Sequence, residues 1–274
     1  MTRFPPGLYV VATPIGNLDD LSPRALGVFQ AADVVAAEDT RTSRKLLELA
    51  GSQARMVSLT EHNVAQRTPA LLDSAREGVV ALVSDAGTPL VADPGARLVE
   101  AAHASDVPVF AIPGPSALAA AISVAGFEGG DVHFLGFLPR QKGERLERLR
   151  AAAAAAAVLV FFESPNRIAS TLRELSEALD DPEVVVCREL TKLHEEAVRG
   201  RASELSVRFE GTRGECTVVV QVPRRERAAV EEGEVLAYLS EMKRAGAQRS
   251  GAAAEAARRF GMARSRAYDL WESV

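Results

Sequence analysis

The segment from Ser84 to Gly95 constrains the fold of this 274-residue chain more than any other. It follows an apolar run, residues 79–83, with the composition of a buried parallel strand, and leads into a helical pattern over residues 96–104. Its glycines can adopt positive φ and its prolines fix its path: Gly87, Gly95, Pro89 and Pro94. In open α/β sheets, ligands bind at the carboxyl ends of strands. We therefore expect a binding loop here, although an ordinary tight turn uses the same residue types.

Similar strand–loop–helix units recur through the first half of the chain. Short apolar runs are followed by polar or glycine- and proline-rich loops, and the runs cover residues 8–12, 33–37, 56–59 and 107–112. This spacing predicts a doubly wound, largely parallel sheet. We assign it to an N-terminal α/β domain, residues 1–124.

The pattern changes near residues 126–130, and a second α/β domain is predicted over residues 125–223. Its expected strands include antiparallel partners, so its sheet should be mixed; they cover residues 133–138, 158–162, 183–187, 195–198 and 217–222. A ligand cleft between the two domains is the natural place for the loops to converge. A charged connector then leads to a helical module, residues 228–274, with the pattern of a helix-turn-helix.

Composition narrows the class of protein. A hydrophobic content of 47% and a net charge of −5 are ordinary for a soluble protein, so nucleic-acid binding would have to rest on a local patch. Cys187 and Cys216 lack the spacing of a metal site and suit a reducing compartment. The longest apolar stretch, residues 151–162, is too short to span a bilayer, and no signal peptide is evident. We expect a cytoplasmic protein with no metal and no membrane segment.

Several catalytic motifs are absent. The chain has no G-x-x-x-x-G-K-[ST], no G-x-G-x-x-G after its first strand and no G-x-S-x-G. The remaining loops are rich in backbone donors and acceptors but poor in nucleophiles. Such a site suits an uncharged or zwitterionic ligand held by the main chain, with chemistry driven by positioning.

Eight loops in order resemble those of the RsmI family, bacterial small-subunit ribosomal RNA methyltransferases of the tetrapyrrole-methylase-like class. The resemblance covers roughly residues 6 to 223, and the helical tail is similar to the family's C-terminal module. The loops cover residues 13–18, 38–41, 61–63, 84–95, 113–116, 136–139, 163–167 and 188–192. The resemblance implies methyl transfer from S-adenosylmethionine (SAM) to the ribose 2′-OH of a cytidine in 16S rRNA of the 30S subunit. It also implies SAM bound between two α/β domains and, usually, a homodimer.

Carried over by motif position, the resemblance implies a set of cofactor contacts. Asp85 could meet the ammonium of the methionine part, the main chain at Ser116 suits its carboxylate, and Phe162 could cover adenine. The expected set is Pro14, Gly16, Asp85, Ala86, Gly87, Thr88, Pro113, Ser116, Ala117, Phe162, Glu189, Leu190 and Thr217.

Methylating a hydroxyl requires its oxygen to lose a proton, so a general base or a stabilising cation is expected near the methyl donor. The candidates, with His62 or Glu61 as the base, are His62, Glu61, Asp39, Arg41 and Lys192. Each has a structural alternative: a cap or supporting hydrogen bond for His62, a local ion pair for Asp39 with Arg41, and a solvated surface side chain for Lys192.

The RNA side of the cleft is expected to include Glu38, Asn63, Arg140, Lys142, Arg145 and Arg167. A basic stretch over residues 140–150 could contact phosphates without specifying sequence. Interspersed glutamates leave a solvated helix face with ion pairs as an alternative. Three phenylalanines, Phe127, Phe134 and Phe137, could stack on bases, although most such side chains are core.

Two other functions stay open at this point. A tetrapyrrole (precorrin-type) SAM methyltransferase shares the fold class, but the loops at residues 38–41 and 163–167 match the RNA-modifying branch. A helix-turn-helix regulator with a small-molecule-sensing α/β domain is the alternative from another class. The balanced charge of residues 228–274 argues against it, and salt-dependent binding to duplex DNA would favour it.

Overall fold

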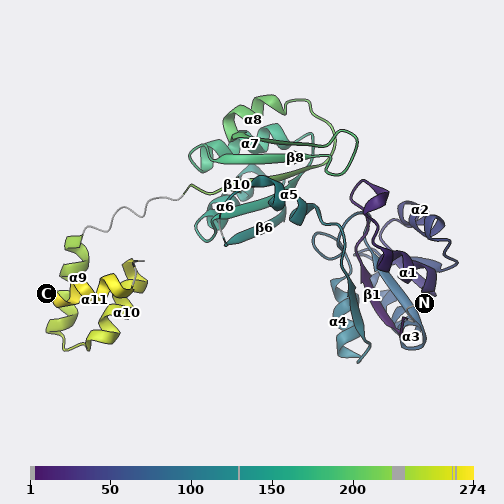
Figure 1. Ribbon diagram of the computed structural model, residues 1–274, viewed down its shortest axis with the longest axis horizontal. Coiled ribbons are helices and arrows are strands. Elements are labelled where there is room, and N and C mark those ends of the chain that lie inside the picture. Colours follow the sequence, from purple (N-terminus) through teal and green to yellow (C-terminus); the bar gives the residue numbers. More distant parts are fainter. Residues whose placement is uncertain (1–3, 129, 224–231, 261, 263) are drawn as a thin grey trace. The chain divides into compact units, whose positions relative to one another are not determined.

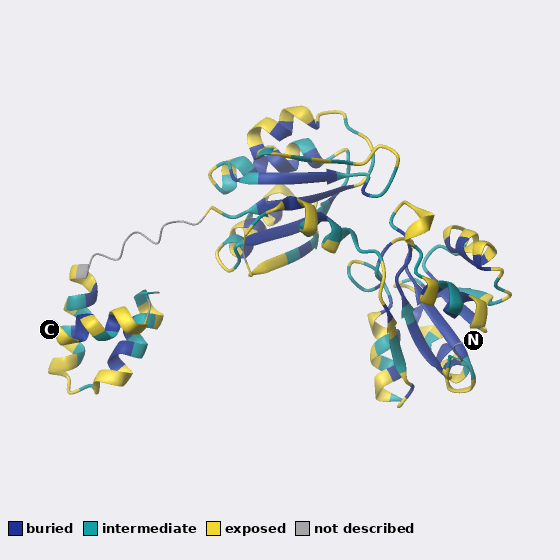
Figure 2. Cartoon of the chain, viewed as in Figure 1, coloured by how far each residue is buried: buried dark blue, intermediate teal, exposed yellow. Residues whose placement is uncertain are grey.

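The computed structural model describes residues 4–128, 130–223, 232–260, 262 and 264–274. The chain divides into two compact units, Met1–Pro223 and Arg224–Val274 (Figure 1). The larger unit contains two five-stranded sheets, and most of their inner strands are buried (Figure 2).

The first sheet has the strand order β3-β2-β4-β1-β5, and every neighbouring pair in it is parallel. This confirms the predicted doubly wound sheet. Its strands are β1 (Gly7–Val11), β2 (Val34–Ala37), β3 (Arg55–Ser58), β4 (Val79–Val83) and β5 (Val109–Ile112).

Helices cover both faces of this sheet because its strand residues alternate between two apolar clusters. Tyr9 and Val11 face α1 (Pro23–Ala31) and α2 (Thr40–Ala50). Leu8, one position along, faces the cluster that contains α3 (Val64–Glu77) and α4 (Ala96–Ala104). A short 3-10 helix, η1 (Leu18–Asp20), precedes α1.

Local signals set the helix ends. The Ser22 side chain accepts a hydrogen bond from the Ala25 N–H at 3.1 Å, and Pro23 occupies the first helical position of α1. Gly51 ends α2 in the left-handed conformation, with φ of 65°.

The order of the strands makes the boundary between β1 and β4 the topological switch point of this sheet. The helix after β1 packs on one face and the helix after β4 on the other, so the two chain paths diverge at this point. The loops after these strands are joined by a pair of hydrogen bonds, Thr13 N–H to the Gly87 carbonyl at 2.9 Å and Gly87 N–H to the Thr13 carbonyl at 3.0 Å. Gly87 adopts φ of 78°, which favours glycine.

The second sheet is mixed, as predicted, with the order β6-β7-β10-β8-β9. β6 and β7 are parallel, and the other pairs are antiparallel. Its strands are β6 (Val132–Phe137), β7 (Val158–Glu163), β8 (Glu183–Arg188), β9 (Glu196–Arg201) and β10 (Cys216–Gln221).

One face of the second sheet packs on α6 (Lys142–Ala153), α7 (Ile168–Ala178) and α8 (Ala202–Arg208). The other face packs on α5 (Ala117–Ala125) through Ala121 and Ala125. α5 therefore belongs by packing to the second sheet, although it lies almost wholly before residue 125. The division of this unit into domains at residues 124 and 125 stays a prediction.

The smaller unit has a core of its own. Three helices, α9 (Glu232–Arg244), α10 (Arg249–Phe260) and α11 (Arg264–Glu272), pack around buried side chains that include Leu239, Ala253 and Trp271. Ser265 lies in the first turn of α11. Most of the predicted connector, residues 224–231, falls outside the described residues.

No helix in the described part of the chain combines the length and the apolar character needed to cross a bilayer.

Candidate active site

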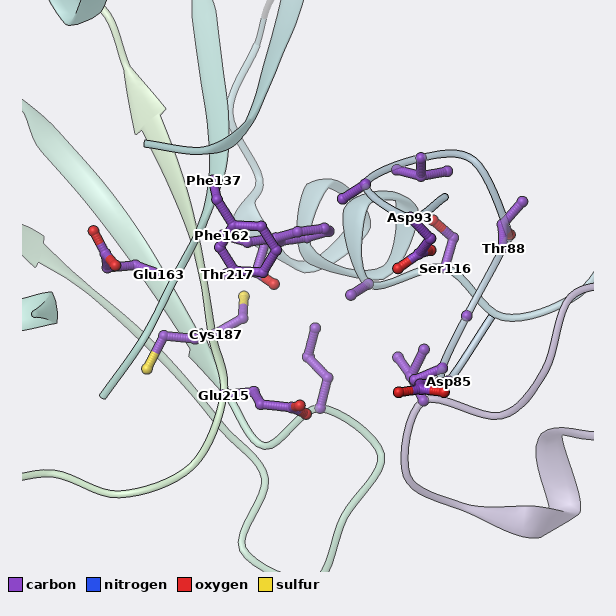
Figure 3. Close-up of a pocket in the computed structure, with 18 of the residues that line it drawn as sticks. Asp85, Thr88, Asp93, Ser116, Phe137, Phe162, Glu163, Cys187, Glu215 and Thr217 are labelled. Carbon is purple, nitrogen blue, oxygen red and sulfur yellow. The ribbon is translucent and has the colours of Figure 1, made fainter. Parts of the chain in front are cut away.

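A cavity of about 360 Å³ lies at the carboxyl ends of strands from both sheets (Figure 3). Pockets for small ligands start near this size. The loops of the first sheet contribute Ile15 and residues 85–88 and 91–93, and the start of α5 contributes Ser116 and Ala117. The second sheet and its loops contribute Phe137, residues 162–165, Cys187, Leu190 and residues 215–217. The loops that the sequence singled out after β4 and β5 therefore open on the same space.

Most residues expected to bind the cofactor line this cavity. They are Asp85, Ala86, Gly87, Thr88, Ser116, Ala117, Phe162, Leu190 and Thr217. Four others do not line it: Pro14, Gly16, Pro113 and Glu189.

Gly16 has a different structural role. A Cβ at this position would meet the Lys192 Cγ at 2.4 Å and the Thr191 Oγ1 at 2.8 Å. The next residue, Asn17, donates its backbone N–H to the Thr191 Oγ1 at 3.0 Å. Glycine is therefore required where the loop after β1 contacts the loop after β8.

The start of α5 forms one end of the cavity. Ser116 is the N-cap, and its hydroxyl makes no capping hydrogen bond, so it and the first N–H groups of the helix are available to a ligand. The Thr88 hydroxyl donates to the Pro115 carbonyl at 3.0 Å and ties this loop to the one after β4. This end of the cavity suits a carboxylate.

Asp85 lines the same cavity and has two roles. Its Oδ1 accepts a hydrogen bond from the Asp39 N–H at 2.9 Å, which joins the loops after β2 and β4. The same side chain lines the cavity and is exposed, so it can also accept a hydrogen bond from a ligand's cation. Asp85 therefore both connects two loops of the site and contributes a negative charge to the cavity.

A second cavity of about 400 Å³ adjoins the first, since Asp93 lines both. Glu61 and His62, expected as general bases, line this second cavity together with the start of α4 and Arg97. Both side chains are exposed. The space beside the cofactor-type cavity thus holds two of the predicted catalytic residues.

Carboxylates gather where the cavities meet. The pKa of Glu38, at the end of β2, is raised by burial and by repulsion from Asp85, Asp93 and Glu61. The pKa of Asp93 is also raised, chiefly by burial, against a hydrogen bond with Ser84. Glu38 itself lines neither cavity, but its charge interacts with carboxylates that line the first cavity (Asp85), the second (Glu61) or both (Asp93).

The other predicted catalytic residues make local contacts. Asp39 caps α2 by accepting from the Arg41 N–H at 2.8 Å and pairs with the Arg41 guanidinium at 3.0 Å, which lowers the pKa of Asp39. Lys192 pairs with Glu189 at 2.9 Å and Glu215 at 2.8 Å. Burial works against the charge of Lys192, but these two carboxylates raise its pKa. The structural alternative expected for Asp39 and Arg41 is thus present.

The residues expected to contact RNA divide into exposed and engaged side chains. Arg140 is exposed, whereas the Asn63 side chain closes a turn by accepting from the Thr60 N–H at 2.8 Å. Lys142 lies 3.5 Å from Glu177. Arg145 corrects the prediction: its side chain is 7% exposed and is bonded to Glu174 through both Nε and Nη2, at 2.7 and 2.9 Å. It cannot reach a phosphate in this structure.

Sequence reasoning missed some cavity residues. Asp93 lies in the loop already singled out, and residues 163–165 belong to a loop quoted only for resemblance. The rule that ligands bind at strand ends could have placed both in the site. Glu215 follows a polar turn and carries no such signal.

Cys187 and Cys216 lie against the cavity but are chemically protected. Burial raises the pKa of Cys187 to about 11 and that of Cys216 to about 12, so little thiolate forms near neutral pH. We expect both thiols of the folded protein to react with Ellman's reagent at least about a hundredfold more slowly than in denaturant. Rapid labelling of the native protein would contradict this placement of the thiols.

The model of the family Tetrapyrrole (Corrin/Porphyrin) Methylases matches residues 7–206. "Ribosomal RNA small subunit methyltransferase I" of Thermotoga maritima is 44% identical over 216 residues, covering 78% of this chain and 97% of the relative. The protein of the same name from Micromonospora olivasterospora is 46% identical over 217 residues, covering 78% and 69%. The chain therefore belongs to the tetrapyrrole methylase family and, within it, to the ribosomal RNA small subunit methyltransferase I proteins.

Solved structures confirm the fold. Diphthine synthase has a TM-score of 0.61 at 19% identity, covering 78% of this chain and 89% of the other. Uroporphyrin-III C-methyltransferase from Thermus thermophilus, complexed with S-adenosyl homocysteine, has a TM-score of 0.55 at 23% identity, covering 78% and 96%. The predicted family and fold class are thus confirmed.

Proposed function

We propose that this protein transfers a methyl group from SAM to the ribose 2′-OH of a cytidine in 16S rRNA of the small ribosomal subunit. The observation that carries the proposal is a cavity with chemically distinct ends, formed by the loops through which the chain resembles its family. The identity of 44–46% to ribosomal RNA methyltransferases favours this function over a tetrapyrrole substrate or a DNA-binding regulator.

The cavity suits the chemistry of SAM. Phe162 and Leu190 offer an apolar wall to a flat adenine ring, while Ser116 and Ala117 at the start of α5 suit a carboxylate. Asp85 provides a negative charge for an ammonium. When bound, SAM supplies an electrophilic methyl group on a sulfonium.

We assign the acceptance of the ribose proton to Glu38. Its raised pKa lies closer to neutrality than that of an ordinary carboxyl group, which favours a general base. Its neighbours Asp93 and Glu61 line the second cavity, where a nucleotide can place its hydroxyl beside the methyl donor. His62 and Glu61 were predicted from the sequence as the general base. We propose instead that they contact the nucleotide at its ribose and phosphate.

The finer assignments follow from the family resemblance. We propose that the protein acts as a homodimer in the cytoplasm. The net charge of −5 gives no general attraction to RNA, so we propose that binding uses a local surface that includes Arg140.

The experiment that tests the function measures tritium transfer from labelled SAM to 30S subunits that lack the modification. We expect label in 16S rRNA, mapped to a ribose 2′-oxygen of a cytidine. Label in a tetrapyrrole but not in rRNA would favour the precorrin-type alternative. If the protein does not bind SAM, both the rRNA methyltransferase and the tetrapyrrole methyltransferase functions are excluded.

A matched substitution tests the cofactor end of the cavity. Asp85→Asn retains the oxygen that accepts from the Asp39 N–H and removes only the charge. We expect it to weaken SAM binding about tenfold, since a hydrogen bond to a charged group is lost, with no change in melting temperature. Calorimetric titration measures the affinity. Asp73→Asn, on the exposed face of α3, serves as the control, and equal affinities for the two variants would exclude Asp85 from ammonium binding.

A further inference from the structure

Phe137 is an exposed aromatic side chain at the rim of the first cavity. It is 60% exposed, although it lines the cavity and its ring lies 5.6 Å from that of Phe162 in an edge-to-face arrangement. Phe162 is itself packed against Phe134, with ring centroids 4.9 Å apart. Figure 3 shows Phe137 and Phe162 together, across the cavity from Asp85 and Ser116.

An irregularity in β6 orients Phe137. The register of β6 against β7 shifts between Phe134 and Phe137, and Gly136 adopts φ of 60°. A Cβ on Gly136 would meet nothing within 4 Å, so glycine serves the backbone conformation here and not close packing. Bulges of this kind redirect side chains next to active sites.

Three arginine side chains hold the segment that carries Phe137, residues 135–140. Arg148 donates to the Leu135 carbonyl at 2.8 Å. Arg145 donates to the carbonyls of Pro139 and Arg140 at 2.8 and 3.0 Å, and Arg167 to those of Leu138 and Pro139 at 3.1 and 3.0 Å. We call Arg145, Arg148 and Arg167 the arginine clamp.

Two members of the arginine clamp are themselves anchored. Arg145 is paired with Glu174 of α7, and both side chains are buried. Arg167 lies 3.2 Å from the buried carboxylate of Glu163, which also accepts from the Thr171 hydroxyl at 2.8 Å. The segment is therefore fixed in advance of ligand binding, which lowers the entropy that a ligand must overcome.

A large aromatic ring that is mostly exposed, on a backbone segment fixed by hydrogen bonds, contributes little to the packing of the protein. It can instead stack against a flat ligand. The inner wall of the cavity already offers Phe162 and Leu190 to adenine, so the rim position of Phe137 faces what approaches from outside. Arg140, on the same segment, is exposed and forms no ion pair within the described chain. An exposed aromatic ring and an exposed, unpaired arginine three residues apart on one segment are a combination suited to a nucleobase and its phosphate.

We propose that Phe137 stacks on an unstacked base of the RNA substrate at the methylated nucleotide, with Arg140 on the adjoining phosphate. This inference rests on the proposed function and specifies how its site selects single-stranded RNA. Stacking contributes equally in the ground and transition states, so it governs the KM for RNA and leaves kcat unchanged.

The test compares Phe137→Ala, Phe137→Tyr and Val132→Ala, the last being an exposed apolar residue on the same strand outside the cavity. For Phe137→Ala we expect the KM for the small-subunit substrate and the Kd for RNA in a filter-binding assay to rise about tenfold. The affinity for SAM, measured by calorimetry, should not change. Phe137→Tyr retains a ring and should restore the wild-type KM, and Val132→Ala should match wild type throughout.

Two outcomes would overturn the inference while leaving the proposed function intact. Weaker SAM binding with an unchanged KM for RNA would place Phe137 in the adenine wall. Wild-type values for every parameter of Phe137→Ala would show that no ligand covers the ring. If the wild-type protein methylates no small-subunit RNA and binds none, the proposed function fails, and the inference fails with it.

Discussion

Replacing Glu38 with glutamine is expected to lower kcat for methyl transfer at least about a hundredfold, the usual contribution of a general base. Glutamine has nearly the same shape but cannot accept the ribose proton. SAM affinity should be unchanged or slightly lower, because one negative charge is removed near Asp85, at a site that binds a cationic ligand. Single-turnover transfer to 30S subunits measures the effect on chemistry.

The pH dependence provides an independent check of Glu38. Burial and three neighbouring carboxylates raise its pKa, so its carboxyl group is protonated and inactive at low pH. The kcat of the wild type should rise with pH through a value above that of an ordinary glutamate, and this step should be absent from Glu38→Gln.

Matched variants separate Glu38 from its competitors. Glu61→Gln and His62→Gln alter the exposed groups of the second cavity. We expect these two to raise the KM for RNA more than they lower kcat. A large loss of kcat in His62→Gln, together with an active Glu38→Gln, would assign the base to His62.

The second large effect concerns stability. Arg145→Met should lower the free energy of unfolding by about 3–5 kcal/mol, because it leaves the carboxylate of Glu174 buried without its partner. It also removes two hydrogen bonds to the carbonyls of Pro139 and Arg140. Urea denaturation followed by circular dichroism measures the change.

Two controls define the cause of this loss. Arg150→Met, at an exposed position of the same helix, should change stability by less than about 0.5 kcal/mol. Combining Arg145→Met with Glu174→Leu removes the unpaired charge and should recover most of the stability. A double variant as unstable as Arg145→Met alone would place the cost in the lost carbonyl contacts instead.

The burial of Arg145 and its pairing with Glu174 could not be predicted from the sequence. Arginines at positions 145, 148 and 150 alternate with glutamates, a local pattern that fits a solvated helix face as well as a phosphate-binding one. The partner of Arg145 is Glu174, on another helix and 29 residues away. Nothing in the local pattern identifies such a pair, because it depends on how α6 and α7 pack.

The loops of the cavity were easier to predict. Residues 84–95 and Ser116 follow apolar strands, and the carboxyl ends of parallel strands meet at one edge of a sheet. Local chemistry therefore indicated the binding edge, and most of the expected cofactor residues share one cavity.

The surroundings of Glu38 depend on strand order, which the sequence does not specify. β2 lies between β3 and β4 in the sheet. Glu38 at the end of β2 therefore lies between Glu61, which follows β3, and Asp85, which follows β4. The sequence supplied the three carboxylates, and only the topology showed which of them lies in the middle.

The position of β1 between β4 and β5 has a consequence for how the chain assembles. β1 is synthesised well before its partner strands, since Gly7 pairs with Val79, and Leu8 pairs with both Val80 and Val109. β1 thus lacks both of its neighbouring strands until β4 has been made, and its second neighbour until β5 has been made. Contacts so distant in sequence form slowly, so we expect the nascent segment that carries β1 to need protection from aggregation during synthesis.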